Sequence, residues 1–206
     1  MIIGVDATSR WIQCATVSEK ERRVVEWQGP IEPLPSRLHS LIGETLTGGL
    51  IILGPGSYTG IRLSLTAMKM LTLVHEVPLM GLPLFDAYLT LNHALIQGVV
   101  LITSPSRKGV FNSQLFQTTA DGFCPMTSLL QIENDQMNQW LSRFQLPMHW
   151  VHFGEVEFNI KSMPVTCNPK RLDIGALLDY YEHKIPAMTT ASSLAPIYAY
   201  PSVVSK

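Results

Sequence analysis

A glycine-rich stretch contains the residues whose types and spacing most suggest chemistry. It reads Gly54-Pro55-Gly56-Ser57-Tyr58-Thr59-Gly60-Ile61-Arg62 and lies between an apolar run and a helical pattern that begins near Ile61. Backbone N–H groups gather at a helix N-terminus, where they can hold anions such as phosphate. The stretch therefore predicts either a ligand-binding loop or a structural turn from a strand into a helix.

The spacing of this glycine loop fits neither of the two common phosphate-binding motifs. A Walker loop ends in Gly-Lys-Ser/Thr, whereas Thr59-Gly60-Ile61 stands at the corresponding place here. The dinucleotide fingerprint has its third glycine where this chain has Thr59. The structural turn stays open as an alternative, in which Pro55 fixes one backbone dihedral and Ser57 or Thr59 caps the following helix.

Asp6 is the second candidate for chemistry. Residues 2–6 have the pattern of a buried strand that ends at this aspartate, and Thr8 and Ser9 follow in a polar turn. A carboxylate at a strand end can approach a metal–phosphate unit, so Asp6, Thr8 and Ser9 are candidates for the phosphate side of a degenerate nucleotide site. The alternative is that Asp6 caps the following turn with its own side chain, which is the commoner use of aspartate there.

The cysteines and histidines do not form a recognisable metal motif. Cys14, Cys124 and Cys167 are far apart and lack Cys-x-x-Cys spacing, so buried reduced thiols are predicted. His149 and His152 alternate with apolar residues in a strand-like run, and on a strand they would point to opposite faces. We therefore predict no metal site, and we find no Ser/His/Asp or Cys/His arrangement typical of nucleophilic catalysis.

The remaining pattern predicts an α/β chain. Strands are predicted at 2–6, 11–18, 23–27, 50–53, 77–81, 99–103, 110–117 and 149–153, and helices at 36–46, 60–75, 84–97, 131–141 and 174–183. Ser36 is expected to cap the first helix and Gly48-Gly49 to end it. The order predicts an α/β domain at residues 1–97 and a smaller second part at 98–206, with the last residues packing back on the first domain.

The helix predicted at 60–75 is apolar around more of its circumference than a single core contact requires. At 100° per residue its polar side chains fall on one narrow stripe, formed by Arg62, Thr66, Lys69, Thr72 and Glu76. Only 15% of the whole chain is charged, against about 25% in an average soluble domain. Both features predict that this helix packs between its own sheet and a second chain.

The composition also argues against several classes of protein. The net charge of −1, with short scattered basic pairs, provides no long-range attraction for nucleic acid, so any RNA contact is expected to be local or made by a partner. The apolar runs, such as 50–53, are far shorter than the roughly 18 residues that span a bilayer. The N-terminus has no basic lead and meets Asp6 early, unlike a secretory signal. A cytoplasmic protein is expected.

With Asp6-Ala7-Thr8-Ser9 on the first strand and the glycine loop before a long apolar helix, the chain resembles the TsaB family. The family's loop reads Gly-Pro-Gly-Ser-Phe/Tyr-Thr-Gly-x-Arg, which residues 54–62 match at every defined position. Leu79-Met80-Gly81 and Pro196-Ile197-Tyr198 are further similarities. The resemblance is strong over residues 1–100 and weak over 100–206. The chain departs from the family in its short 36–50 connection and in Ser104-Pro105-Ser106-Arg107, where members commonly have Asp-Ala-Arg.

The resemblance implies an α/β fold of the actin-like ATPase (ribonuclease H-like) type, with two similar halves of which the second is smaller and divergent. It implies a non-catalytic scaffold or activating subunit, without a cofactor of its own, in a complex that uses ATP. That complex forms the threonylcarbamoyl group on N6 of the adenosine adjacent to the anticodon in tRNAs. The implied partners are a TsaD-like catalytic subunit and a TsaE-like ATPase, with tRNA contacted only through the complex. TsaD carries a His-x-x-x-His metal pair that this sequence lacks.

We expect the helices near 36–46 and 60–76 to pack against equivalent helices of the catalytic partner, or to form a homodimer in its absence. The expected interface residues are Leu38, Leu41, Ile42, Ile61, Leu65 and Met68. Two rival hypotheses remain. One is an ATP-dependent phosphotransferase or threonylcarbamoyltransferase that uses Asp6 near the phosphates. The other is an interaction protein that kept the fold and lost the tRNA role.

Overall fold

The chain forms two units in the computed structural model, and each is described by itself. One contains Met1–Ala87 and Leu172–Ile197, and the other contains Tyr88–Arg171 and Tyr198–Lys206. The structure describes residues 1–144, 148–154, 167–169, 171–187 and 194–201. The boundary expected from the sequence lies between 97 and 98, whereas residues 88–97 belong to the second unit. The late segment that returns to the first unit is 172–197, and the chain rejoins the second unit at Tyr198.

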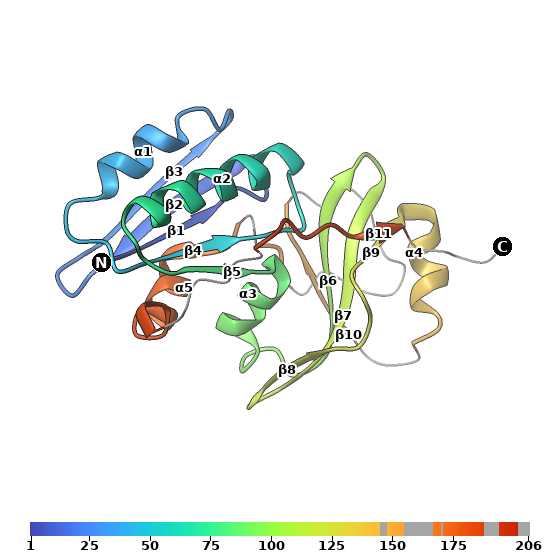
Figure 1. Cartoon of the computed structure of the whole chain (residues 1–206). Helices are drawn as coiled ribbons and strands as arrows, with labels where there is room; N and C mark the ends of the chain where they lie inside the picture. The colour runs from blue at the N-terminus through green and yellow to red at the C-terminus, as the bar shows by residue number, and fades with distance from the viewer. Residues whose placement is uncertain (145–147, 155–166, 170, 188–193, 202–206) are drawn as a thin grey trace. The chain divides into compact units, whose positions relative to one another are not determined.

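A five-stranded sheet in the order β3-β2-β1-β4-β5 forms the centre of the first unit (Figure 1). Its strands are β1 (Ile2–Asp6), β2 (Trp11–Val17), β3 (Arg22–Gln28), β4 (Gly48–Ile52) and β5 (Leu79–Leu82). β2 pairs antiparallel with both β1 and β3, which confirms the predicted meander, whereas β4 runs parallel to β1 and to β5. The carboxyl ends of β1 and β4 therefore lie at the same edge of the sheet, where Asp6 and the glycine loop follow.

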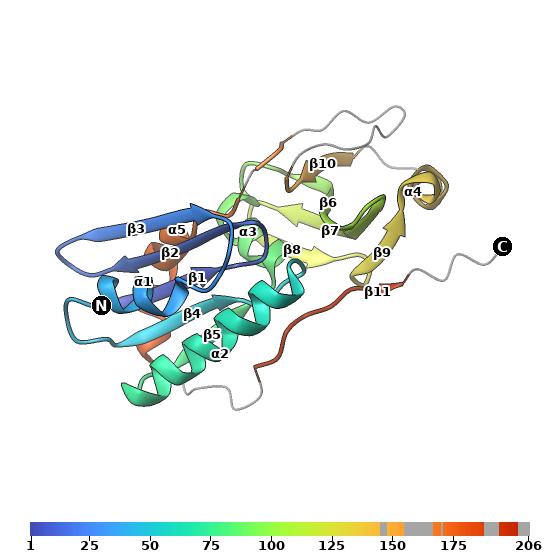
Figure 2. The same ribbon diagram turned by 90° about the horizontal axis from the view of Figure 1, so that it is seen from above.

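Helices cover both faces of this sheet (Figure 2). α1 (Leu34–Leu41) and α2 (Tyr58–Val74) lie on one face, and α5 (Ile174–Tyr181) lies on the other. The alternation of β1 explains this, because Ile3 and Val5 join the core with α1 and α2 while Gly4 faces α5. A Cβ at Gly4 would lie 3.0 Å from Leu178 Cδ2, so the missing side chain lets α5 approach the sheet closely.

Polar contacts fix the start of α5 against β2 and β3. Asp173 caps the helix, and its carboxylate lies 2.7 Å from an Arg22 guanidinium nitrogen. Arg22 also pairs with Asp179 at 3.0 Å, and Gln13 Oε1 accepts a hydrogen bond from the Ile174 amide at 2.7 Å. The first unit is thus completed by a segment from late in the chain. A boundary drawn at the end of a helical pattern could not include it.

The second unit has its own sheet, in the order β10-β6-β7-β9-β11, with β8 pairing with β7. Its strands are β6 (Gly98–Arg107), β7 (Val110–Thr119), β8 (Gly122–Pro125), β9 (Leu130–Glu133), β10 (Met148–His152) and β11 (Tyr200–Pro201). α4 (Asn134–Leu141) packs on this sheet through Met137, Trp140 and Leu141. α3 (Leu84–Asn92) contains the junction of the two units, and a short 3-10 helix, η1 (Ile185–Ala187), follows α5.

Three sequence-based assignments around the first helix are wrong. Ser36 is not its N-cap, because the helix begins earlier and the Ser36 hydroxyl donates to Pro33 O inside the first turn. The helix ends at Leu41. Gly48 and Gly49 belong to β4 instead of ending the helix. Their missing side chains make room for others, since a Cβ at Gly48 would lie 2.4 Å from Ile185 Cγ2.

Two assignments in the second unit also change. β6 continues to Arg107, so the connection between the strands predicted at 99–103 and 110–117 is confined to residues 108 and 109. Residues 130–133 form β9 before α4 begins, although a single helix is expected from 131 to 141. Both strands pair with β7, and this long-range pairing is not visible in a local pattern.

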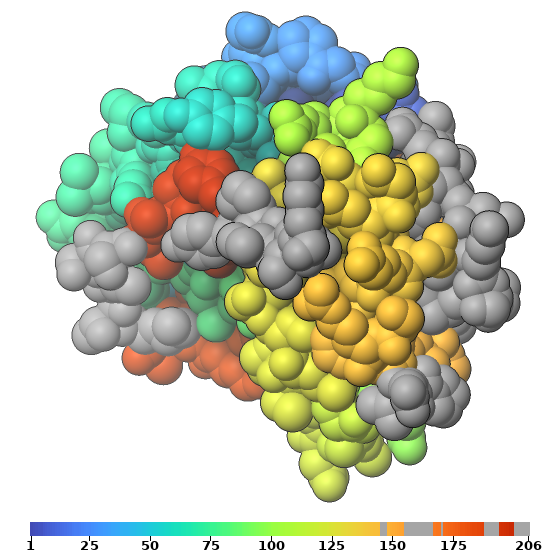
Figure 3. Space-filling view, turned by 90° about the vertical axis from the view of Figure 1, so that its right-hand side faces the viewer, coloured from blue at the N-terminus to red at the C-terminus, as the bar shows by residue number. Residues whose placement is uncertain are grey.

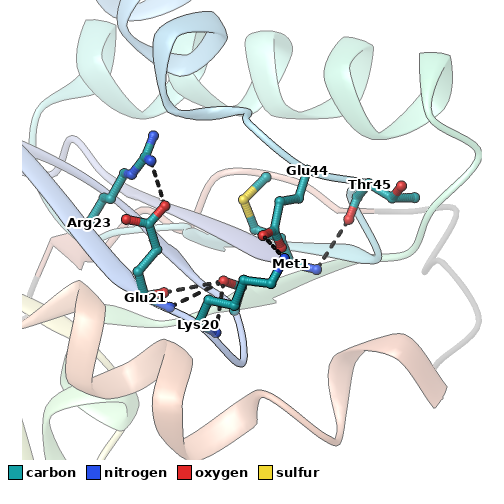
Figure 4. Close-up of polar contacts among 7 residues, drawn as sticks. Met1, Lys20, Glu21, Arg23, Glu44 and Thr45 are labelled. Carbon is teal, nitrogen blue, oxygen red and sulfur yellow. Dashed lines mark hydrogen bonds and ion pairs between the residues drawn. The ribbon is translucent and has the colours of Figure 1, made fainter.

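Exposed polar contacts join the β2–β3 turn and the chain start to the loop after α1 (Figure 4). Lys20 Nζ lies 3.2 Å from Glu44 Oε1, and the Met1 amine donates to Thr45 O at 3.1 Å. Lys20 is 80% exposed, so its ion pair is screened by solvent and adds little stability. In the part of the chain that the structure describes, none of the helices combines the length and the apolarity needed to cross a membrane.

Candidate functional site

Asp6 is buried at the end of β1, and its carboxylate is used by the turn that follows it. The Thr8 amide donates to Asp6 Oδ1 at 2.9 Å, and the Thr8 hydroxyl donates to the same oxygen at 2.7 Å. Ser9 bonds in the same local way, with its hydroxyl accepting from the Trp11 amide at 3.0 Å. The interpretation of Asp6 as a residue that caps its own turn is confirmed.

The burial of Asp6 gives a prediction about pH. Burial raises the pKa of Asp6 above its ordinary value of 3.8, and the two hydrogen bonds from Thr8 oppose this rise. The folded state therefore binds the proton more tightly than the unfolded state. The stability contributed by this carboxyl is fully present below the unfolded-state pKa and is lost as the pH rises through the raised folded-state pKa.

We therefore expect Asp6→Asn to stabilise the fold at about pH 7 relative to its effect at about pH 3, because an uncharged amide oxygen can still accept both Thr8 bonds. Urea unfolding of both proteins across this pH range measures the difference. Asp121→Asn, the same substitution in the exposed turn before β8, is the control for the general effect of removing a carboxylate. An Asp6→Asn effect that does not vary with pH would contradict the assignment.

The glycine loop lies directly on the β1–β2 turn. The Ser57 amide donates to Thr8 O at 2.6 Å. A Cβ at Gly56 would lie 2.1 Å from Thr8 O, and one at Gly60 would lie 2.2 Å from Ala7 O. Only glycine permits such an approach of one backbone to another. The two glycines are therefore explained by contact with the chain's own turn.

Hydrogen bonds within the first unit also hold the glycine loop near its two ends. The Gly54–Pro55 peptide bond is cis and Gly54 has a φ of +112°, a conformation that favours glycine. Gly54 O accepts a hydrogen bond from the Leu84 amide at 2.6 Å. Ser57 caps α2, with its side-chain oxygen accepting from the Gly60 amide at 3.2 Å. Of the two caps expected, the structure shows Ser57.

An actin-like ATPase fold implies a nucleotide with its metal ion, and the residues of this turn do not fit a phosphate cradle. The Thr8 hydroxyl donates to Asp6, and the Ser9 hydroxyl donates to Trp11 O at 3.1 Å. The Thr8 carbonyl, in turn, faces the glycine loop. The side-chain donors expected on the phosphate side are thus engaged inside the first unit.

The remaining polar side chains of the loop point outward. Tyr58 is 57% exposed, Thr59 is exposed, and the Tyr58 hydroxyl accepts a hydrogen bond from Arg62. The Arg62 guanidinium lies over the Tyr58 ring, 4.9 Å from its centroid. The pair forms a small cationic and aromatic surface at the start of α2.

The histidine pair of the second unit lies on β10, as expected. His152 is fully buried, and its Nδ1 lies 2.7 Å from Thr103 Oγ1, which also accepts a hydrogen bond from Trp150 Nε1 at 2.9 Å. His149 is half-buried and is the second residue of the strand. Within the described residues, no three His, Cys, Asp or Glu side chains come together in a way that could hold a metal ion.

The residues expected at the partner interface mostly lie inside the first unit. Leu38, Leu41, Ile61, Leu65 and Met68 are all buried, and only Ile42 is half-buried. The buried side of α2 also includes two small polar residues, Ser64 and Thr72, whose hydroxyls bond to the helix backbone. These apolar side chains therefore hold α1 and α2 to their own sheet and are not presented to a second chain.

A different set of apolar side chains covers the outer side of α2. Leu63 is 48% exposed, Met70 63%, and both Leu73 and Val74 78%. Leu63, Met70 and Val74 fall within about 40° of one another around the helix axis, and half-buried Ala67 lies about 20° beyond Val74. We call these residues the outer stripe of α2: Leu63, Ala67, Met70, Leu73 and Val74. The sequence indicated this stripe, because apolar residues occupy more of the circumference of α2 than one core contact requires. Which of these residues face the sheet could be assigned only once the position of the sheet was known.

No family model matches the sequence, and no curated protein matches it. Solved structures match the fold. One, described as an uncharacterized protein with similarity to peptidase YeaZ from Pseudomonas aeruginosa, has a TM-score of 0.69 and 15% identity, covering 96% of this chain and 98% of that one. Another, YeaZ from Pseudomonas aeruginosa, has a TM-score of 0.67 and 14% identity, covering 95% of this chain and 99% of that one. The likeness confirms the expected fold class, the α/β actin-like ATPase fold.

Proposed function

We propose that this chain is a TsaB-like, non-catalytic subunit of a complex that forms the threonylcarbamoyl group on N6 of the adenosine adjacent to the anticodon in tRNAs. The observation that carries the proposal is the fold match to YeaZ over nearly the whole of both chains. The glycine loop supports it, because its residues 54–62 fit the family pattern and are used to hold α2 against the β1–β2 turn.

The proposed partner surface is the outer stripe of α2. Five exposed or half-exposed apolar side chains on one side of a 17-residue helix suit packing against another helix. The proposed occupant is a helix of a TsaD-like catalytic subunit, with a TsaE-like ATPase joining the complex. The interface expected from the sequence is thereby moved from the inner to the outer side of the same helix.

A second copy of the chain is the alternative occupant when the partner is absent. In an antiparallel pair related by a two-fold axis near residues 68 and 69, Leu63 would face Val74 of the other copy, and Ala67 would face Met70. The small side chain of Ala67 would then leave room for Met70 of the other copy. Arg62 would lie near Glu76 of the other copy, which pairs opposite charges.

The role proposed for this chain is to support catalysis by its partner. Asp6 is the candidate for contact with phosphates, and its carboxylate accepts two hydrogen bonds from Thr8. This supports the proposal of a subunit that has no cofactor of its own, in a complex that uses ATP. tRNA is proposed to be contacted through the complex, since the net charge of −1 gives no general attraction for RNA. A cytoplasmic location is part of the proposal.

The decisive experiment is depletion of the protein, followed by mass spectrometry of nucleosides from total tRNA. We expect threonylcarbamoyladenosine to fall severalfold and to be restored by the wild-type chain. Restoration by Met70→Glu should fail, whereas restoration by Lys20→Met, an exposed change on another part of the first unit, should succeed. Normal levels of the modified nucleoside after depletion would rule out the proposed function.

The rival enzyme hypothesis has its own test. Calorimetric titration of the isolated chain with ATP and magnesium is expected to show little or no binding, because the phosphate-side donors are engaged within the turn. Saturable binding that is lost in Asp6→Asn would instead favour a phosphotransferase or a transferase that acts by itself.

A further inference from the structure

Residues 194–197 lie across the first unit where β4 ends and the glycine loop begins. The Ile197 amide donates to Leu53 O at 2.7 Å, and a Cβ at Gly54 would lie 2.7 Å from Ile197 O. Leu194 and Ile197 pack against the core of this unit. We call residues 194–197 the C-terminal strap. Figure 3 shows it in red beside the teal surface of the glycine loop and the start of α2.

Lys69 holds this strap from α2. Its Nζ donates to the backbone oxygen of Leu194 at 2.6 Å. Lys69 is itself exposed, lies beside Met70, and is one turn from Leu73 on the same helix. The residue that fixes the strap therefore also borders the outer stripe. A carboxylate near the outer stripe would compete for the ammonium group, because a charged acceptor bonds it more strongly than a neutral carbonyl.

The strap continues directly into the second unit. Ile197 is the last residue of the first unit, and β11, which begins at Tyr200, pairs parallel with β9 in the second. The three intervening peptide units limit the distance between the Cα atoms of Ile197 and Tyr200 to roughly 11 Å. If Ile197 moves, only residues 198 and 199 can change their backbone dihedrals before the chain enters β11.

We propose that the strap is a conformational device that responds to occupation of the outer stripe. An acidic side chain that docks beside Lys69 takes its ammonium group, releases Leu194 and weakens the bond between Ile197 and Leu53. The start of the glycine loop is then freed. The proposal rests on the proposed function for the identity of the docking partner, but all of its contacts belong to the isolated chain.

The test uses amide hydrogen exchange of the isolated full chain, measured by NMR. The Ile197 amide reports the strap, and the Leu84 amide, bonded to Gly54 O, reports the start of the glycine loop. Lys69→Met should raise the exchange rates of both amides roughly three- to tenfold, because a charge-assisted hydrogen bond at a partly exposed site is removed. Lys20→Met, which removes the same charge from an exposed ion pair, should change neither rate.

A second pair of variants mimics the docked partner. Leu73→Glu places a carboxylate four residues after Lys69 and should raise exchange of the Ile197 amide about twofold, whereas Leu73→Gln should not. Unchanged Ile197 exchange in Lys69→Met, or an equal effect of Leu73→Glu and Leu73→Gln, would overturn the proposal. A rise at Ile197 without one at Leu84 would overturn the link to the glycine loop. None of these outcomes depends on tRNA modification, so a failure here is distinct from a failure of the proposed function.

Discussion

Gly56→Ala is expected to lower the free energy of unfolding by about 3 kcal/mol or more. The added Cβ would lie 2.1 Å from the backbone oxygen of Thr8 and 2.8 Å from its carbonyl carbon. If the Cβ met a flexible side chain, that side chain could rotate away. It meets the backbone of the β1–β2 turn instead, which is fixed by strand pairing and by the hydrogen bond to Asp6. The glycine loop must therefore move, which breaks the hydrogen bond between the Ser57 amide and Thr8 O.

Urea unfolding of Gly56→Ala beside a matched control measures this effect. Gly122→Ala is the control, because no atom lies within 4 Å of the Cβ it would add and its φ is not left-handed. It should leave stability within about 0.5 kcal/mol of the wild type. If the two variants unfold at the same urea concentration, the close packing of the loop on the turn is disproved.

Two neighbouring methionines on α2 are expected to give opposite results when replaced by glutamate. Met68→Glu should unfold the first unit, at a cost of about 4 kcal/mol or more, because Met68 is fully buried and the carboxylate would have no partner there. Met70→Glu should change stability by no more than about 0.5 kcal/mol, because Met70 is 63% exposed. The same variant should weaken binding of the TsaD-like subunit at least about tenfold.

Circular dichroism and co-purification with the catalytic subunit separate these two effects. Leu95→Glu is the matched control, since it makes the same kind of change at a residue of the second unit that is 83% exposed. It should fold and bind normally. Normal binding by Met70→Glu would move the partner surface away from the outer stripe, and a stable Met68→Glu would contradict the packing of α2.

Local periodicity was sufficient to predict most of the elements. The first three strands and α2 are found close to their expected positions, because alternation and helical spacing are properties of neighbouring residues. The α2 faces were harder to assign. Thr72 is expected on the polar stripe but is 3% exposed, because its hydroxyl bonds to Met68 O and leaves an apolar surface toward the sheet.

Long-range contacts explain most of what could not be predicted. The loop pattern marked residues 54–60 as unusual, but it could not show that Gly56 meets Thr8, far earlier in the chain. The capping role of Asp6 was predictable because both donor groups belong to Thr8, in the next turn. The strap contact between Lys69 and Leu194 joins residues 125 positions apart and leaves no local signal.

The late position of α5 has a consequence for protein synthesis. Within the described residues, the sheet face formed by Gly4 and its neighbours is covered by a helix that begins at Ile174, whereas β1 begins at Ile2. The nascent chain therefore carries an uncovered apolar sheet face until α5 has left the ribosome, a period in which chaperones and aggregation compete for it. A translation product that stops before residue 172 is expected to be a substrate for proteolysis, not a folded half.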